Sequence, residues 1–184
     1  MDTVGESLDR ALEQAFTRPV PKSAQAQMRY LVKRLKGTRP AAELLGVSQR
    51  TVERYLAGTL KRPRKELAAR LEHEVRSRWQ PQVRARAKER AATAEGIVVS
   101  ARARFGFTAA PGSTDDPRLR HITQALPPRW ADRLFTARDE GATESRLKEI
   151  AAQGLGETYF RDGGRRAQGL LVEFTDVEEI DISL

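Results

Sequence analysis

The chain has 184 residues, a formal net charge of +8, two histidines and no cysteine. A disulfide framework and a thiolate metal site are excluded, and two histidines disfavour a zinc site. No apolar run is long enough to span a membrane, and the amino-terminal residues lack the apolar stretch of a signal peptide. We therefore expect a cytoplasmic protein that has no membrane partner and no metal of its own.

The charge is unevenly distributed along the chain. Residues 1–95 carry 21 Lys and Arg against 11 Asp and Glu, whereas residues 96–184 carry 12 against 14. A basic half joined to a near-neutral half indicates that the first half meets a polyanion. Because an arginine-rich proteome would give the same bias, composition alone leaves nucleic-acid binding undecided.

Apolar residues at helical spacing dominate the first half of the chain. Helices are predicted over residues 4–16, 24–36, 63–79 and 82–95. Ser23 is a suitable N-cap for the second of these helices, and Gly37 is suited to end it. Pro81 interrupts the third helix or begins the fourth.

Residues 38–58 meet the narrow requirements of a helix-turn-helix. Ala42 is small where the two helices cross, and Gly46, four residues on, supplies the positive φ that the turn needs. Ser48 is a good N-cap for the second helix, and Val52 is placed to pack inward. An ordinary pair of helices would explain this spacing alone, but the basic residues on both sides favour DNA binding.

The second helix of this motif is expected to lie in the major groove of DNA. The predicted contacts are Gln49, Arg50, Glu53 and Arg54 on that helix and Lys61, Arg62, Arg64 and Lys65 beyond it. Arginine pairs bidentately with guanine and glutamine with adenine, so the helix would read bases. The cations beyond the helix would hold phosphates and position the protein without reading sequence.

From Gly96 onward the apolar pattern alternates with period two, which is typical of strands. Strands are predicted over residues 97–107, 119–126, 159–160, 170–174 and 177–182. Helices are predicted over residues 128–141 and 143–153, and a turn-rich stretch over residues 109–117. We therefore predict an α+β fold: a mostly helical domain over residues 1–95 that contains the helix-turn-helix, and a small mixed domain with a sheet over residues 96–184.

Four aromatic residues are candidate platforms for unpaired bases, namely Trp79, Phe105, Phe107 and Trp130. Core packing is the preferred interpretation of Trp79, which continues a ladder of apolar residues at four-residue steps. Arg102 and Arg104 lie on the strand face opposite the two phenylalanines, so they predict a basic outer face that could bind phosphate. The acidic run over residues 176–181 is interpreted as an edge strand kept soluble by its charge, and not as a metal site.

Three blocks of the sequence resemble the Tpg-type telomere terminal proteins, which cap the linear chromosomes and plasmids of actinomycetes. They are MDTVGESLDRA at the start, LGVSQRTVERYLAG over residues 45–58 and LVEFTDVEEI over residues 171–180. The resemblance implies a protein that is attached covalently to the 5′ end of DNA. It also implies that a side-chain hydroxyl of the protein accepts the first deoxynucleotide and primes synthesis that patches the end.

The same resemblance implies the partners. They are the telomeric DNA end with its folded 3′ overhang, a telomere-binding companion protein and a DNA polymerase, which would bring Mg²⁺ and the deoxynucleotide. The chain would then be a substrate of nucleotidylation and not an enzyme, and it would be associated with the nucleoid. The sequence leaves open the DNA recognised, the first nucleotide added and the oligomeric state.

The priming hydroxyl must protrude, because it has to enter the active site of another protein. Ser113 and Thr114 are surrounded by turn residues and lie beside Asp115 and Asp116, whose carboxylates could accept a proton or help to hold a metal. We prefer Thr114, which is next to the carboxylates and nearer the centre of the stretch, and keep Ser113 as the alternative. A plain surface turn is the competing interpretation. Tyr30 and Tyr55 are expected to pack within helices, Tyr159 within a strand core, and Thr51 is expected to be part of the recognition helix.

The alternative function is a helix-turn-helix transcription regulator whose α+β domain dimerises. A regulator of this kind would protect a short duplex site as a homodimer. An integrase or relaxase is disfavoured, because neither the catalytic tyrosine with Arg and His partners nor a cluster of metal-binding residues is present at suitable spacing.

Overall fold

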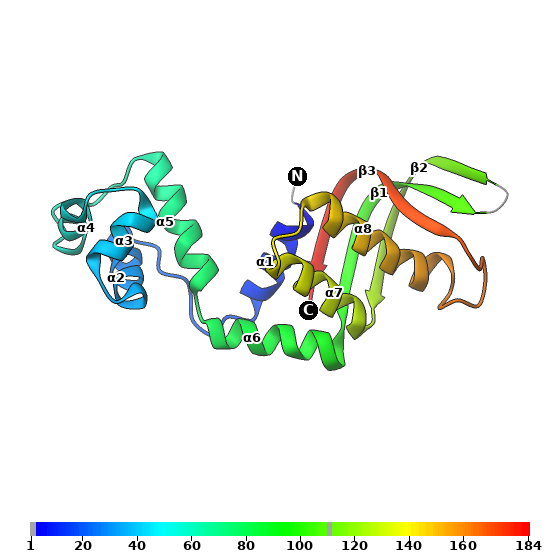
Figure 1. Ribbon diagram of the computed structural model, residues 1–184, viewed down its shortest axis with the longest axis horizontal. Helices are drawn as coiled ribbons and strands as arrows, with labels where there is room; N and C mark the ends of the chain where they lie inside the picture. The colour runs from blue at the N-terminus through cyan, green and yellow to red at the C-terminus, as the bar shows by residue number, and fades with distance from the viewer. Residues whose placement is uncertain (1–2, 110–111) are drawn as a thin grey trace. The chain divides into compact units, whose positions relative to one another are not determined.

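The computed structural model describes residues 3–109 and 112–184, and it divides the chain into two compact units (Figure 1). We call residues 17–81 the helical unit, and residues 1–16 together with residues 82–184 the sheet unit. No helix in the described residues is long and apolar enough to cross a membrane.

The predicted domain boundary between residues 95 and 96 falls inside the sheet unit. Val4 and Leu8 of the first helix, together with Ala87 and Ala91, are buried in the same core as the sheet. Periodicity shows that a segment is helical, but it does not show which core the apolar face of that helix completes. The structure therefore assigns the first helix and the whole segment 82–95 to the sheet unit.

The helical unit contains α2 (Ala24–Leu35), α3 (Thr38–Leu45), α4 (Gln49–Leu56) and α5 (Lys65–Arg78). The predicted start of α2 is confirmed, because Oγ of Ser23 accepts a hydrogen bond from the N–H of Ala26 at 3.2 Å. The apolar faces of these helices meet in one core, at the centre of which Leu31, Leu45, Val52 and Leu71 are fully buried.

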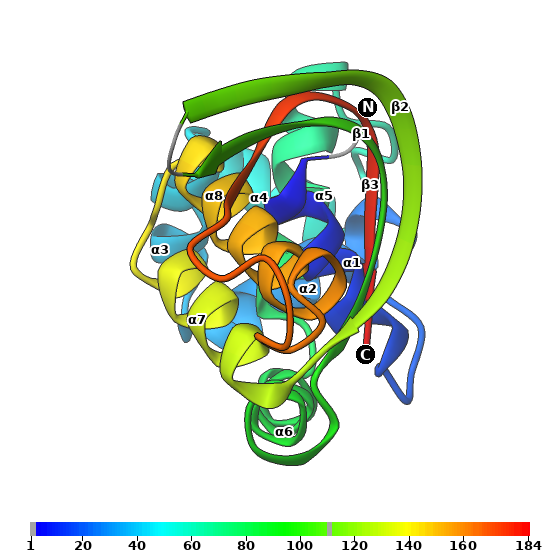
Figure 2. The same ribbon diagram turned by 90° about the vertical axis from the view of Figure 1, so that its right-hand side faces the viewer.

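The sheet unit contains β1 (Ile97–Ala109), β2 (Gly112–Leu126) and β3 (Leu171–Ser183), paired antiparallel in the order β2-β1-β3. Its helices are α1 (Val4–Gln14), α6 (Pro81–Arg90), α7 (Pro128–Asp139) and α8 (Glu144–Leu155), with short π-helical segments η1 (Ala91–Glu95) and η2 (Gly156–Phe160). The sheet curves around α1, α7 and α8, which pack on its inner face (Figure 2). The predicted α+β fold with a helical amino-terminal half is confirmed.

Ala109 and residues 112–117 do not form the predicted turn-rich stretch, because Ala109 ends β1 and β2 begins at Gly112. Residues 110 and 111 of that prediction lie outside the described residues. In this part of the sheet Ser113 lies opposite Thr108, and Thr114 lies opposite Phe107. Backbone pairing with β1 therefore overrides the local turn preference of the segment. Pro117 is tolerated because β2 is an edge strand and the pairing register shifts beside it, between Arg120 and Asp116.

The predicted strand at residues 159–160 is also wrong, since Tyr159 and Phe160 end the π-helical segment η2. The Phe160 ring lies 5.1 Å from the ring of Phe105 and 5.1 Å from that of Phe107, measured between centroids. The apolar character that indicated a strand is thus used to pack the end of a helix onto the sheet. The two strands predicted over 170–174 and 177–182 form one continuous strand, β3, which lies at an edge as expected.

Candidate nucleic-acid interface

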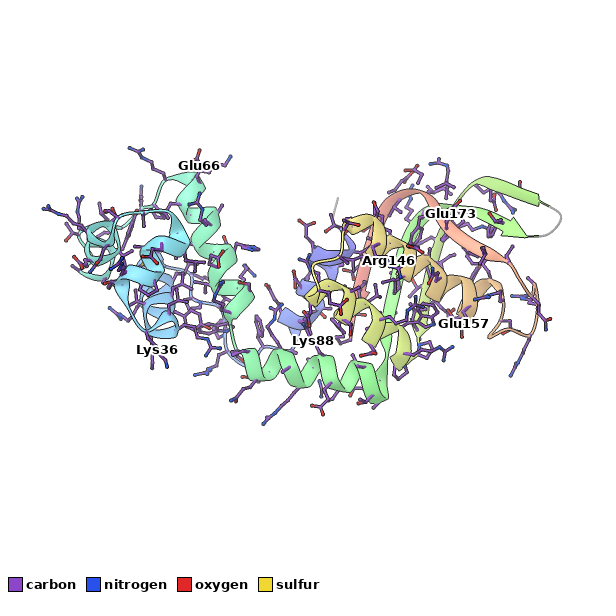
Figure 3. The ribbon with its side chains drawn as sticks, in the orientation of Figure 1. Lys36, Glu66, Lys88, Arg146, Glu157 and Glu173 are labelled. Carbon is purple, nitrogen blue, oxygen red and sulfur yellow. The ribbon has the colours of Figure 1, made fainter. Side chains whose placement is uncertain are left out.

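Positive charge is concentrated in the helical unit. Residues 17–81 contain 16 Lys and Arg, five Glu and no Asp, a net charge of +11, whereas the rest of the chain has a net charge of −3. The side chain of Lys36, after α2, projects from the surface of this unit (Figure 3). The structural division therefore separates the charges more sharply than the division at residue 95, and a polyanion would be attracted to the helical unit.

The predicted helix-turn-helix is formed by α3 and α4. Gly46 ends α3 with a φ of 62°, and the N–H of Val47 donates to the carbonyl of Ala42 at 3.0 Å. Ser48 caps α4, because its Oγ accepts a hydrogen bond from the N–H of Thr51 at 3.2 Å. Val52 is completely buried, as expected for the residue that fastens α4 to the core.

A residue of α5 that the sequence reasoning missed fastens this turn. Nη1 of Arg70 donates a hydrogen bond to the carbonyl of Leu45 at 2.6 Å, at the end of α3. A Cβ atom at Gly46 would lie 2.5 Å from the same nitrogen, so the glycine also makes room for the guanidinium. No spacing rule links positions so far apart in the sequence, and the local pattern therefore carried no signal for Arg70.

The outward face of α4 carries the residues predicted to read bases. Gln49, Arg50, Glu53 and Arg54 are all exposed on this face. Nε2 of Gln49 donates to Oε1 of Glu53 at 2.9 Å, so these two side chains hold each other. Neither Arg50 nor Arg54 forms an ion pair with another described residue, which leaves both guanidinium groups available to DNA.

The predicted phosphate contacts follow α4 directly. Lys61, Arg62 and Arg64 lie between α4 and α5, and Lys65 is the first residue of α5. All four side chains are exposed. The structure thus brings the predicted base contacts and the predicted phosphate contacts together in one unit, on α4 and the segment that follows it.

The outer face of the sheet does not offer the basic surface that Arg102 and Arg104 suggest. Nε of Arg102 lies 3.1 Å from a carboxylate oxygen of Glu178, and Nη1 of Arg104 lies 2.6 Å from one of Asp176. The acidic run of β3 therefore pairs with the arginines of β1. This pairing explains both the acidic run over residues 176–181 and the two arginines, and it neutralises this face of the sheet.

The candidate priming residues lie in β2, near the end of the β1–β2 hairpin (Figure 1). Thr114 is exposed and lies opposite Phe107 in the sheet. The backbones of Ser113 and Asp115 belong to the same strand, but their side chains lie outside the described part of the structure. The preferred hydroxyl is thus held by a strand and not by a loose turn.

Asp116 does not have the environment of a proton acceptor or a metal ligand. Its side chain is 10% exposed, and Oδ1 accepts a hydrogen bond from Nε of Arg118 at 3.0 Å. Oδ2 accepts from Nη2 of Arg118 at 3.1 Å and from Nε of Arg120 at 3.1 Å. Hydrogen bonds from Arg118, followed by those from Arg120, hold the pKa of this carboxyl far below its ordinary range. The expected role of Asp116 in proton transfer is therefore not supported by its contacts.

The other hydroxyl side chains considered in the sequence differ in burial and contacts. Tyr55 is buried in the helical unit, as expected. Thr51 belongs to α4, as expected, and its Oγ1 lies 2.9 Å from Oγ of Ser48. Tyr159 differs from its prediction, because it is 41% exposed and does not belong to a strand core. It is another exposed hydroxyl of the sheet unit and has to be compared with Thr114.

These features are all that identify the site. Comparisons with protein-family models, curated proteins and solved structures gave no match. Within the described residues, no group of three or more His, Asp or Glu side chains could hold a metal ion. The functional conclusion therefore depends on the geometry of α4 and of the hairpin.

Proposed function

We propose that this protein binds the ends of linear DNA and serves as the primer for synthesis that patches those ends. The helical unit binds DNA through α4, and a hydroxyl near the hairpin end of the sheet unit becomes linked to the 5′ end. The observation that carries the DNA-binding part is the capped α4 helix, whose outward face presents two unpaired arginines, Arg50 and Arg54. Exposure of Thr114 in an ordered strand supports the priming part.

Priming is a phosphoryl transfer in which the protein supplies only the nucleophile. The hydroxyl oxygen of Thr114 attacks the α-phosphorus of a deoxynucleoside triphosphate, a new P–O bond forms, and pyrophosphate leaves with the electrons of the bond that breaks. The hydroxyl proton passes to a base of the polymerase, since the carboxylate of Asp116 is occupied by arginines. Mg²⁺ bound by the polymerase neutralises the phosphates.

The polymerase partner completes this proposal. The guanidinium of Arg118 lies in the same strand as Thr114, but it is paired with Asp116, so the positive charge for the incoming triphosphate comes from the polymerase. The chain is then a substrate and not a catalyst. A companion protein that binds the 3′ overhang would bring it to the DNA end, and the protein would be found in the nucleoid.

A deoxynucleotidylation assay tests the priming step. The wild-type protein is incubated with labelled nucleotide, Mg²⁺, telomeric single strand and extract from a host with linear replicons, and is then run on a denaturing gel. We expect label on the wild-type protein and on Thr114→Ser, and no label on Thr114→Ala. Ser113→Ala and Tyr159→Phe are matched controls that keep the label.

The controls also define how the proposal fails. Loss of label in Ser113→Ala or Tyr159→Phe, with Thr114→Ala still labelled, would move the primer to that hydroxyl. An unlabelled wild-type protein, under conditions in which a known terminal protein is labelled, would contradict priming altogether.

The alternative function is a transcription regulator, which the exposed Gln49 and Arg50 at the start of α4 also favour. A regulator would protect a short, palindromic duplex site as a dimer and would carry no covalent nucleotide. Footprinting on duplex DNA, run beside the labelling assay, separates the two functions.

A further inference from the structure

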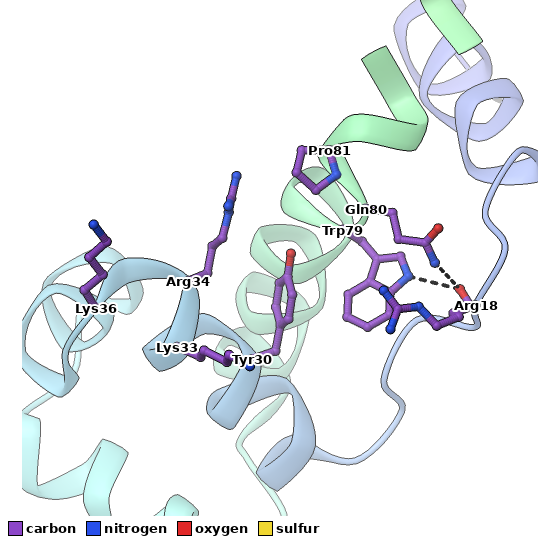
Figure 4. Close-up of a pocket in the computed structure, with 8 residues that line it drawn as sticks. All are labelled: Arg18, Tyr30, Lys33, Arg34, Lys36, Trp79, Gln80 and Pro81. Carbon is purple, nitrogen blue, oxygen red and sulfur yellow. Dashed lines mark hydrogen bonds between the residues drawn. The ribbon is translucent and has the colours of Figure 1, made fainter. Parts of the chain in front are cut away.

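A pocket of about 450 Å³ lies in the helical unit, between the end of α2 and the end of α5 (Figure 4). Its wall includes two aromatic side chains and four cations, namely Tyr30, Trp79, Arg18, Lys33, Arg34 and Lys36. None of these residues belongs to α4 or to the sheet unit. The pocket is therefore separate from both sites of the proposed function.

The two aromatic rings are fixed by their polar edges. Their centroids are 4.8 Å apart and their planes are inclined at 59°. The hydroxyl of Tyr30 donates to the carbonyl of Arg78, and Nε1 of Trp79 donates to the carbonyl of Arg18 at 3.0 Å. Burial raises the pKa of Tyr30, although Arg34 and Arg78 act against it, so the phenol stays a neutral donor. Both rings are half-buried and keep part of their surface toward the pocket.

Gln80 holds in place the backbone segment that contains Arg18. Its Nε2 donates to the carbonyl of Arg18 at 3.0 Å, and its Oε1 accepts hydrogen bonds from the backbone N–H and the hydroxyl of Thr17, at 3.1 and 3.0 Å. The residue has a φ of 43°, in the left-handed region that side chains other than glycine rarely adopt. A strained residue held by three hydrogen bonds is typical of a position that the surrounding structure needs.

The charge around this pocket is of one sign. No carboxylate lines it, and none of Arg18, Lys33 and Arg34 forms an ion pair with another described residue. Lys36 likewise has no such partner, in contrast to the arginines of β1. Exposed cations beside aromatic rings are the combination that binds single-stranded nucleic acid, with phosphates on the cations and bases on the rings.

We propose that this pocket binds one nucleotide, with its base against the rings of Tyr30 and Trp79 and its phosphate on Lys33 and Arg34. An unpaired DNA strand or a free deoxynucleoside triphosphate can present this chemistry. A duplex cannot, because its bases are stacked on one another. The pocket thus distinguishes an unpaired nucleotide from the duplex that α4 would read.

Tryptophan fluorescence gives a direct test, because the protein contains two tryptophans and the other, Trp130, is buried in the sheet unit. In the full chain carrying Trp130→Phe, Trp79 is the remaining tryptophan. We expect oligothymidylate to quench its fluorescence in a saturable manner, and duplex DNA of matched length to leave the fluorescence unchanged. Thymidine triphosphate in a parallel titration shows whether a free nucleotide suffices.

Substitutions in the pocket supply the second arm. Lys33→Ala with Arg34→Ala should weaken oligothymidylate binding about tenfold or more, since both phosphate contacts are lost. Arg29→Ala, on the same helix but outside the pocket, is the matched control and should leave binding nearly unchanged. The anisotropy of a fluorescent oligothymidylate with otherwise wild-type protein repeats the comparison without Trp130→Phe. Thermal unfolding confirms that each variant is folded.

Equal weakening by Arg29→Ala, full binding by the double variant, or equal quenching by duplex DNA would each overturn the pocket assignment. The outcome is independent of the proposed function. In Thr114→Ala, oligothymidylate should quench the Trp79 fluorescence as in the parent protein, even where labelling is lost. Arg50→Ala with Arg54→Ala should lose duplex binding, while oligothymidylate still quenches the Trp79 fluorescence.

Discussion

The helical unit and the sheet unit use their charged residues in different ways. In the sheet unit, several ion pairs join elements that are far apart in the sequence: Asp9 of α1 lies 3.1 Å from Arg84 and 2.8 Å from Arg138. In the helical unit, ion pairs lie within one helix, such as the exposed pair of Arg39 and Glu43 at 3.1 Å. Exposed pairs of this kind contribute little to stability.

The cations of the two units therefore have different availability. In the sheet unit, Arg84 and Arg138 help to hold helices together, whereas Arg50 and Arg54 of α4 remain unpaired. An arginine-rich composition by itself does not locate a DNA-binding surface, because a carboxylate nearby can neutralise it. Arg102 and Arg104 on β1 show this, since both of them form ion pairs with carboxylates of β3.

The prediction with the largest effect tests whether unpaired cations bind duplex DNA and paired cations do not. Arg50→Ala with Arg54→Ala should weaken duplex binding by about a hundredfold or more, since each base or phosphate contact contributes about 1–3 kcal/mol. Arg102→Ala with Arg104→Ala should leave duplex binding nearly unchanged, because those guanidinium groups already bind carboxylates. Electrophoretic mobility shifts at one fixed salt concentration measure both. Similar losses in the two double variants would refute the distinction between paired and unpaired cations.

The next prediction concerns the turn of the helix-turn-helix. Gly46→Ala should destabilise the protein by about 2 kcal/mol or more, because alanine is strained at positive φ and its Cβ would collide with Arg70. Gly141→Ala has a similar φ of 78° but meets no atom within 4 Å, so it should cost only the backbone strain, about 1 kcal/mol. Urea denaturation followed by circular dichroism measures the difference. Equal losses would show that Arg70 simply moves aside.

A smaller effect separates positioning from base reading. Lys61→Ala should weaken binding to all duplex sequences alike and reduce the dependence of log affinity on log salt concentration by about one unit. Arg50→Ala should instead change the preference among sequences. Titrations over a range of salt concentrations with two unrelated duplexes distinguish these outcomes. A change of preference in Lys61→Ala would reassign that residue to base reading.

The smallest expected effect lies in the sheet unit. The pKa of Asp116 is lowered in the folded protein, so its charged form stabilises the fold above its ordinary pKa of about 4, and this contribution is lost as the pH falls below that value. Asp116→Asn should therefore lower the melting temperature slightly at pH 7, and the gap to the wild type should close in acid. Asp132→Asn, which changes an exposed carboxyl on α7, is the control. A gap that stays constant with pH would contradict the arginine pairing.

The helix-turn-helix could be predicted because its signals are local. Ser48 caps α4, Gly46 takes the positive φ, and Val52 faces the core, and each of these depends only on neighbours along the chain. Helix α1 and the start of α2 follow from the same kind of signal. The exposed face of α4 then follows, since the positions left over by the buried stripe must face outward.

The conformations of residues 112–117 and of Tyr159 with Phe160 could not be predicted in the same way. Residues 112–117 have the composition of a turn, yet they extend β2 because β1 offers a strand edge to pair with. Tyr159 and Phe160 have the composition of a strand, yet they end a helix because Phe160 packs on Phe105 and Phe107. In both places, a partner distant in sequence decides the conformation.

The fold class, the position of the helix-turn-helix and the residues that its second helix exposes all follow from local signals, because caps, glycines and apolar spacing act over a few residues. Three other features emerge only in the folded chain: which helices belong to the sheet, which arginines are neutralised, and the pocket shared by Arg18, Tyr30 and Trp79. These features depend on contacts across many residues of chain, and the same local pattern is compatible with several such contacts.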